Sequence, residues 1–127
     1  MSDEFSCPVG NEQVIPENLA GGFFVYNAIG NLELLFADQN LIELFGCTTM
    51  EELRTLTGNS FRGMVHPEDY DKIDSDIIAQ TFNSDKKHDY VRYRIITKSG
   101  EIRYVEDFGH LLHGQNGEKI FYVYLVD

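Results

Sequence analysis

Hydrophobic residues gather in five short stretches near the two ends of the chain. Residues 21–27 and 32–37 are rich in aromatic and aliphatic side chains, and so are residues 90–98, 101–113 and 119–127. Along 90–98 apolar and polar residues alternate, which places successive side chains on opposite faces of a strand. The pattern therefore predicts five β-strands, two early and three late in the sequence.

Turn signals separate these strands. Gly30–Asn31 lies between the first two, Ser99–Gly100 between the next two, and Asn116–Gly117 between the last two. Glycine and asparagine suit tight hairpin turns because they adopt positive φ angles with little strain. We expect a β-hairpin and, after the helices, a three-stranded antiparallel meander.

The residues between the two groups of strands have helical signals. Asp38 can cap a first helix that ends at Gly46. Thr49 and Glu52 have the spacing of a capping box at the start of a second helix, which Gly58 ends.

Two further helical segments follow. Residues 60–65 are consistent with a short turn of helix. From Pro67 onward the chain has a helical pattern for about four turns, with Tyr70, Ile73 and Ile77 on one face. Residues 83–89 form a polar loop, and we expect His88 to be solvated there.

The predicted order is β-β-α-α-α-α-β-β-β, with strands and helices segregated. This indicates an α+β fold with one five-stranded antiparallel sheet and short helices packed on one face. We expect residues 21–127 to form the domain and residues 1–20 to be a flexible or partly helical N-terminal segment.

Charge and cysteine content narrow the function. The chain has 127 residues and a net charge of −11, which disfavours nucleic acid and anionic membrane surfaces as partners. The local group of Arg92, Arg94 and Arg103 is expected to pair with carboxylates. Cys7 and Cys47 lack metal-ligand spacing, and no signal peptide is apparent, so a cytoplasmic protein with reduced thiols is expected.

The stretch "GMVHPEDYDKI" (63–73) contains the most conspicuous candidate chemistry. His66, Glu68 and Asp69 are residue types of a general acid/base pair or of a metal site. Proline is also favoured at the first helical position, and carboxylates there meet the positive end of the helix dipole. We prefer this structural interpretation, in which His66, Pro67, Glu68 and Asp69 mark the start of the long helix.

The other histidines form no obvious metal site. His110 and His113 are three residues apart on a predicted strand and should point to opposite faces. Glu106 and His110 share a face, but a zinc site would need at least one more protein ligand. We predict no metal site and no catalytic residues.

Several motifs together resemble a PAS domain (the PAS/PAC sensory module). They are "ELLFADQNLIELFGCTTMEELRTLTGNSFRGMVHPEDYDKI" followed by "YRIITKSGEIRYVEDFGHLL" and "GEKIFYVYLVD". The resemblance covers about residues 21–127, and its topology is the one predicted above. Two positions depart from the common pattern, where Asp38 replaces Asn and Tyr104 replaces Trp, and neither threatens the fold.

The resemblance implies a sensory module of a bacterial signalling protein, without enzymatic activity of its own. Such a module binds a small molecule or mediates dimerisation, and regulates a covalently linked C-terminal effector. The variant looks most like those ahead of GGDEF diguanylate cyclase or histidine kinase effectors. A homodimer is implied, formed through the N-terminal segment and the exposed face of the sheet. A ligand-free dimerisation scaffold is one alternative.

A haem- or flavin-binding redox or gas sensor is the other alternative, and we disfavour both cofactors. The resemblance includes light-sensing LOV domains, which use a cysteine in an Asn-Cys-Arg-Phe setting. The comparable residues here are Asn59-Ser60-Phe61-Arg62, and serine cannot form the thiol adduct. Cys47 lies at the end of an earlier helix.

The interior between sheet and helices is the remaining candidate site. Sequence alone does not establish which strand positions face inward or whether the core is filled. A pocket would be lined by apolar residues with a few polar groups. The candidate lining residues are Phe36, Phe61, Val65, Ile73, Ile77, Tyr93, Ile95, Phe108 and His110.

Overall fold

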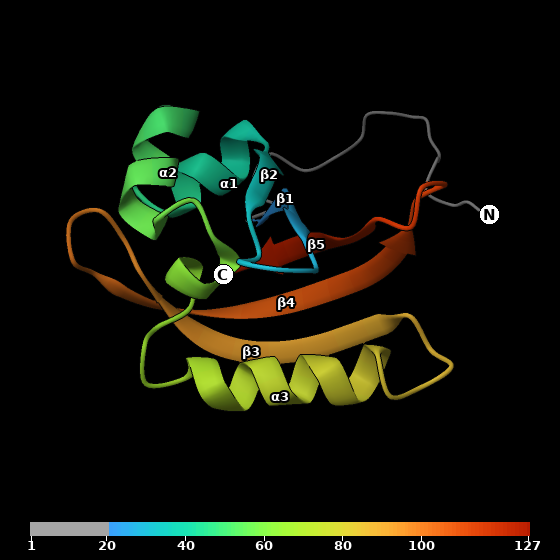
Figure 1. Ribbon diagram of the computed structural model, residues 1–127. Coiled ribbons are helices and arrows are strands. Elements are labelled where there is room, and N and C mark those ends of the chain that lie inside the picture. Colours follow the sequence, from blue (N-terminus) through green and yellow to red (C-terminus); the bar gives the residue numbers. More distant parts are fainter. Residues whose placement is uncertain (1–20) are drawn as a thin grey trace, which may run out of the picture.

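The computed structural model describes residues 21–127 and contains one five-stranded antiparallel sheet (Figure 1). Strands β1 (Gly21–Asn27) and β2 (Leu34–Ala37) form the predicted hairpin. Strands β3 (His88–Ile96), β4 (Ile102–His113) and β5 (Lys119–Val126) form the predicted meander. Because β5 also pairs with β1, the strand order is β2-β1-β5-β4-β3. The N-terminal prediction for residues 1–20 lies outside the described part.

Four helical segments connect β2 to β3, as predicted. They are α1 (Gln39–Leu44), α2 (Met50–Thr57), the 3₁₀ helix η2 (Phe61–Met64) and α3 (Tyr70–Thr81). Figure 1 shows α1 and α2 near β1 and β2, and α3 running alongside β3. None of the helices in residues 21–127 has the length and apolar character needed to cross a membrane.

The cap of α1 also joins this helix to the sheet. Asp38 Oδ1 accepts hydrogen bonds from Leu41 N (2.9 Å) and from Phe23 N on β1 (3.1 Å). The first bond satisfies a free N–H of the helix, and the second fixes where the helix begins relative to the strand.

The cap of α2 differs slightly from the predicted capping box. Thr49 Oγ1 accepts from Glu52 N (3.1 Å), as expected. The Glu52 carboxylate bonds to Thr48 N (2.7 Å) instead of the cap residue's own N–H. Gly58 ends the helix with a φ of 69°, a left-handed conformation that glycine adopts without strain.

Helix α3 begins at Tyr70, three residues later than predicted. Residues 67–69 form a turn ahead of it, and Asp69 at the cap position makes no side-chain cap bond. The prediction of Pro67 as the first helical residue was therefore wrong. The reason lies in contacts with β3, described below.

The core lies between the helices and one face of the sheet. Inward-facing positions alternate along the strands, and the buried faces of α1, α2, η2 and α3 pack on them. The largest fully buried side chains come from both layers: Phe24, Leu34, Leu41, Phe45, Leu53, Phe61, Met64, Ile95, Leu111 and Leu125.

Each outer edge of the sheet is partly hydrogen-bonded by a loop or a side chain. At the β2 edge, Leu34 N donates to Asn59 O (2.9 Å), and Phe61 N donates to Leu32 O (2.9 Å). At the β3 edge, the Gln80 side chain bonds both the N–H (2.8 Å) and the C=O (3.1 Å) of Tyr90. These contacts attach the helical layer and its loops to both edge strands, β2 and β3.

Candidate functional site

The His66–Asp69 turn fastens the start of α3 to the edge strand β3. His66 N donates to Arg94 O (2.8 Å). In return Arg94 donates three hydrogen bonds to the Asp69 carboxylate, from its backbone N (2.9 Å), Nε (3.1 Å) and Nη2 (2.7 Å). The guanidinium beside Asp69 holds the pKa of this carboxyl below its usual value.

Each of the three candidates for acid/base chemistry makes a side-chain hydrogen bond within the turn or to Arg94. The His66 ring accepts a hydrogen bond at Nδ1 from Glu68 N (3.0 Å). The Glu68 carboxylate reaches Arg94 Nη2 (3.3 Å), and the Asp69 carboxylate is bonded to Arg94 as well. The turn therefore acts as a structural clamp between helix and strand.

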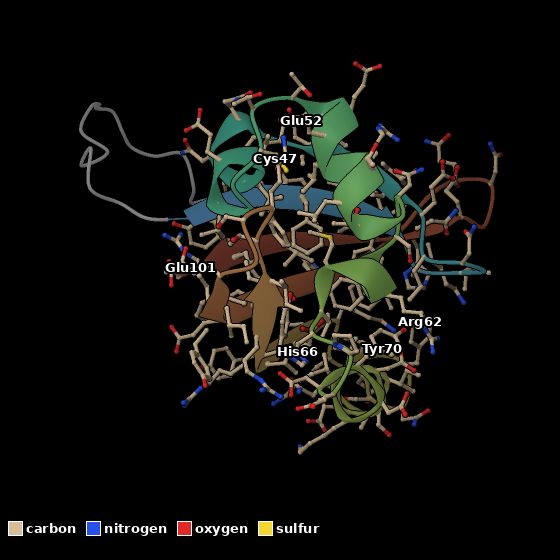
Figure 2. All side chains as sticks on the ribbon, turned by 90° about the vertical axis from the view of Figure 1, so that its left-hand side faces the viewer. Cys47, Glu52, Arg62, His66, Tyr70 and Glu101 are labelled. Atoms are coloured by element: carbon tan, nitrogen blue, oxygen red, sulfur yellow. The ribbon has the colours of Figure 1, made fainter. Side chains whose placement is uncertain are left out.

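A hollow of about 460 Å³ lies next to this turn, between η2 and the start of α3. Figure 2 shows Arg62, His66 and Tyr70 together in this region. The Arg62 guanidinium lies 4.7 Å from the centroid of the Tyr70 ring, a cation–π contact. The Tyr70 hydroxyl is 3.4 Å from Asp74 Oδ1. The Arg62 and Tyr70 side chains at this hollow are thus engaged in contacts within the protein.

Aromatic rings stack on one another in the interior. The Phe61 ring is parallel to the Tyr26 ring, with centroids 4.5 Å apart, and its centroid lies 6.1 Å from those of Phe24 and Tyr93. The candidate lining residues that lie in this buried layer are Phe61, Val65, Ile73, Ile77, Tyr93 and Ile95.

Three candidate lining residues lie on the opposite face of the sheet, so their assignment to the interior was wrong. Phe36 is 52% exposed and Phe108 is 46% exposed. His110 has the same strand parity as Phe108 and faces outward with it. At Phe36 the register of β1 with β2 shifts, and two consecutive β2 residues, Leu35 and Phe36, are exposed.

Two carboxyls that sequence reasoning missed lie in the interior. Asp107 is 1% exposed and accepts a hydrogen bond from the Tyr93 hydroxyl (2.7 Å). Asp89 is 6% exposed, and its Oδ1 has no hydrogen-bond partner among the described residues. Asp89 lies over Gly109, where a Cβ would come within 2.6 Å of Asp89 Oδ2.

Burial raises the pKa of both carboxyls. Desolvation of the charged form raises the pKa of Asp89 to about 6. The pKa of Asp107 is also raised, first by burial and then by the negative charge of Asp89. Both residues have the same inward strand parity as the apolar residues Val91, Val105 and Leu111. This shared parity was the available sequence signal.

The outward face of the sheet carries a line of aromatic side chains. Tyr90, Phe108, Tyr124 and Phe23 are successive partners across β3, β4, β5 and β1. We call these four residues the aromatic row. Ring centroids are 5.0 Å apart for Tyr90 and Phe108, and 4.9 Å apart for Phe23 and Tyr124. Within residues 21–127 no helix covers this face.

His88 belongs to β3 and not to the preceding loop, so its expected position was wrong, although it is exposed to solvent as expected. Its ring packs against His110 on the outward face, with centroids 4.3 Å apart. His113 lies at the end of β4, opposite Lys119. Across residues 21–127, no group of three or more His, Cys, Asp or Glu side chains could hold a metal ion.

Comparison with known proteins identifies the fold. The sequence model of the PAS fold matches residues 34–126, so the chain belongs to the PAS-fold family. PAS domains are sensory modules of signal transduction. No curated protein sequence matches the chain significantly.

Solved structures of PAS domains are similar to this one. A PAS domain from a two-component sensor histidine kinase has 18% identity and a TM-score of 0.63, covering 85% of each chain. The N-terminal domain of a diguanylate cyclase with PAS/PAC sensor from Marinobacter aquaeolei has 16% identity and a TM-score of 0.58, covering 84% of this chain and 94% of that one. The blue-light photoreceptor Aureochrome1 LOV has 16% identity and a TM-score of 0.58, covering 84% and 80%.

The residues present here do not fit light-driven flavin chemistry through a cysteine adduct. Ser60 caps η2, accepting from Arg62 N (3.1 Å) and donating to Asn31 O (2.9 Å). The described thiol, Cys47, is buried beyond the C-terminal end of α1, where burial raises its pKa. The aromatic rings described above pack between the sheet and the helices.

Replacing Asp69 by alanine should loosen α3 from β3. The variant leaves the Arg94 backbone N–H and guanidinium without their partner, and we expect it to lower the free energy of unfolding at pH 7 by about 1–3 kcal/mol. Because the folded-state pKa of Asp69 is lowered, its contribution is present above the usual carboxyl pKa and is lost as pH falls through the folded-state value. Urea unfolding at several pH values measures both effects.

Glu68→Ala is the matched control for Asp69, because Glu68 contacts the same guanidinium from an exposed position. We expect it to change the free energy of unfolding by less than about 1 kcal/mol. Equal losses for the two variants would contradict the assignment of Asp69 as the clamp.

Replacing Asp89 by asparagine should stabilise the protein above pH 7. The folded-state pKa of about 6 exceeds the unfolded value near ~3.9, so the folded state binds the proton more tightly and wild-type stability falls as pH rises between them. Asparagine removes the buried charge, and we expect a gain of about 1–3 kcal/mol at pH 8 that disappears near pH 4. The exposed Asp85→Asn is the control, and a pH-independent difference for Asp89→Asn would contradict the prediction.

Proposed function

We propose that the chain is a sensory module that forms a homodimer through the exposed face of its sheet. In the cytoplasm it regulates a covalently linked C-terminal effector, a GGDEF diguanylate cyclase or a histidine kinase. Membership of the PAS-fold family and the likeness to a PAS domain of a histidine kinase and to a domain of a diguanylate cyclase support the effector class. The module itself has no enzymatic activity.

The aromatic row is the observation that carries the dimer proposal. Tyr90, Phe108 and nearby Tyr122 are 42%, 46% and 44% exposed, and they lie on the neighbouring strands β3, β4 and β5. Exposed clusters of large apolar side chains mark interaction sites, because contact between apolar surface and water is unfavourable in free energy. A broad depression of about 850 Å³, lined mostly by apolar atoms, extends over the same residues.

A second copy of the chain suits this surface. Contact of the face with its own copy about a two-fold axis would oppose aromatic side chains to aromatic side chains. Tyrosine and tryptophan are common at the centres of interfaces. The Tyr90 hydroxyl donates a hydrogen bond to Glu106 Oε2 (2.6 Å), which restrains the ring. Tyr90 therefore presents a ring that is held in place.

The position of β5 links the dimer face to the interior. β5 lies between β1 and β4, with Phe121, Val123 and Leu125 in the core and Tyr122 and Tyr124 on the outer face. A change in the packing of either face alters the environment of the same strand. A signal shifts such an equilibrium only by its differential affinity for the two arrangements.

Recognition of a small molecule in the interior is the second candidate. The interior residues Phe61, Val65, Ile73, Ile77, Tyr93 and Ile95 remain its proposed lining. The Asp89 carboxylate favours this candidate, because a buried oxygen without a partner is costly and would be satisfied by a hydrogen-bond donor. Haem and flavin are not proposed, and a ligand-free scaffold stays the alternative.

Replacing Phe108 by lysine should weaken the dimer. The substitution places a charge in the aromatic row at an exposed position, so the monomer should keep its fold. We expect the dimer dissociation constant, measured by analytical ultracentrifugation, to rise at least about tenfold. Ile78→Lys, an equally apolar exposed position on α3, is the control and should leave it unchanged.

A monomeric wild-type chain at all accessible concentrations, or equal effects of Phe108→Lys and Ile78→Lys, would refute the dimer proposal. Deletion of residues 1–20 tests separately whether that segment contributes to association. An unchanged dissociation constant after deletion assigns the interface to the sheet face.

Native mass spectrometry of the purified chain tests the small-molecule candidate. A retained mass that is lost in Asp89→Asn would support recognition in the interior, because the ligand's donor loses its carboxylate. An absorption spectrum recorded above 300 nm distinguishes a coloured cofactor from a colourless ligand. No retained mass in the wild type would favour the ligand-free scaffold.

A further inference from the structure

His88 and His110 are paired across neighbouring strands on the outward face. The register of β3 and β4 places them directly opposite each other, and His110 is in turn opposite Tyr122 on β5. The two histidines therefore form the end of a second line of residues, beside the aromatic row. His88 is exposed and His110 is partly exposed, so solvent reaches the pair.

The backbone hydrogen bonds show that this is a close pair. The N–H and C=O of Tyr90 point away from β4 to the Gln80 side chain, and those of Arg94 point to the His66–Asp69 turn. Even-numbered β3 residues are thus the non-hydrogen-bonded positions of the antiparallel ladder. Side chains at such positions approach each other most closely, with Cα atoms about 4.5 Å apart.

The rings are close enough to bind one ion together. Their centroids are 4.3 Å apart and their planes differ by 36°. Two imidazole nitrogens that bind one ion at about 2.0–2.1 Å in neighbouring coordination positions are roughly 3 Å apart. A centroid separation of 4.3 Å is compatible with ring nitrogens at this separation.

We propose that His88 and His110 form a two-histidine site for a divalent transition-metal ion of the nickel, copper or zinc class. Imidazole ligands suit these ions and not magnesium or calcium, which prefer oxygen. Water completes the coordination, because the described residues supply two protein ligands at this position.

Binding at this position would fasten the start of β3 to β4. The pair lies at the end of the two strands farthest from their connecting turn at residues 97–101, where His88 follows the loop from α3. An ion held by both side chains would join the two strands at this open end. Because the ion binds only the folded arrangement, it would raise the thermal stability.

Calorimetric titration of the untagged full chain with Ni²⁺ at pH 7.5 tests the site. We expect saturable binding with one ion per chain, a rise in the unfolding temperature, and weaker binding at pH 5, because protons compete with the metal ion for imidazole nitrogens. Mg²⁺ at the same concentration should show no binding.

The variants His88→Asn and His110→Asn should each weaken Ni²⁺ binding about tenfold or more, because the second imidazole no longer acts at a high effective concentration. His113→Asn, three residues farther along β4, is the matched control and should bind as the wild type does. The proposal is overturned if wild-type binding is absent below about 1 mM Ni²⁺, or if the His88 and His110 variants bind as tightly as the control.

Discussion

The arrangement of this domain depends on one constraint: successive strand residues point to opposite faces, and the described helices cover only one of them. Every inward position must then be compatible with a packed interior, and every outward position must meet solvent or another molecule. Phe121, Val123 and Leu125 satisfy the first condition, while Tyr122 and Tyr124 on the same strand are left to the second. The buried aromatic stack, the buried carboxyls, the aromatic row and the histidine pair all follow from this division.

Local signals in the sequence were sufficient for most of the fold. The strands, their turns, the caps at Asp38 and Thr49, and the glycine ends of the first two helices were predicted because each depends on residues a few positions apart. The start of α3 was not, because Asp69 turns its carboxylate to Arg94, 25 positions later in the chain. Residues 67–69, which resemble a helix start in the sequence, therefore form the turn ahead of α3.

The sites were harder to predict because they depend on which face a strand position occupies. Phe108 was a candidate for the interior as an apolar side chain and His110 as a polar group for a pocket, whereas the pairing of β4 places Asp107 and Gly109 inward instead. His88 was read as a loop residue because its surroundings in the sequence are polar. Only the partner strand reveals that it begins β3 and lies opposite His110.

The loops and side chains bonded to the two sheet edges have a consequence for how the domain can associate. The backbone groups of Tyr90, Arg94, Leu32 and Leu34 that face outward at these edges are already paired within the chain. An incoming strand would have to displace these bonds, so growth of the sheet by edge-to-edge addition, the route to open-ended polymers, is opposed. Association through the outer face of the sheet remains possible, and two copies are enough to cover that face. This favours a closed dimer over a fibre.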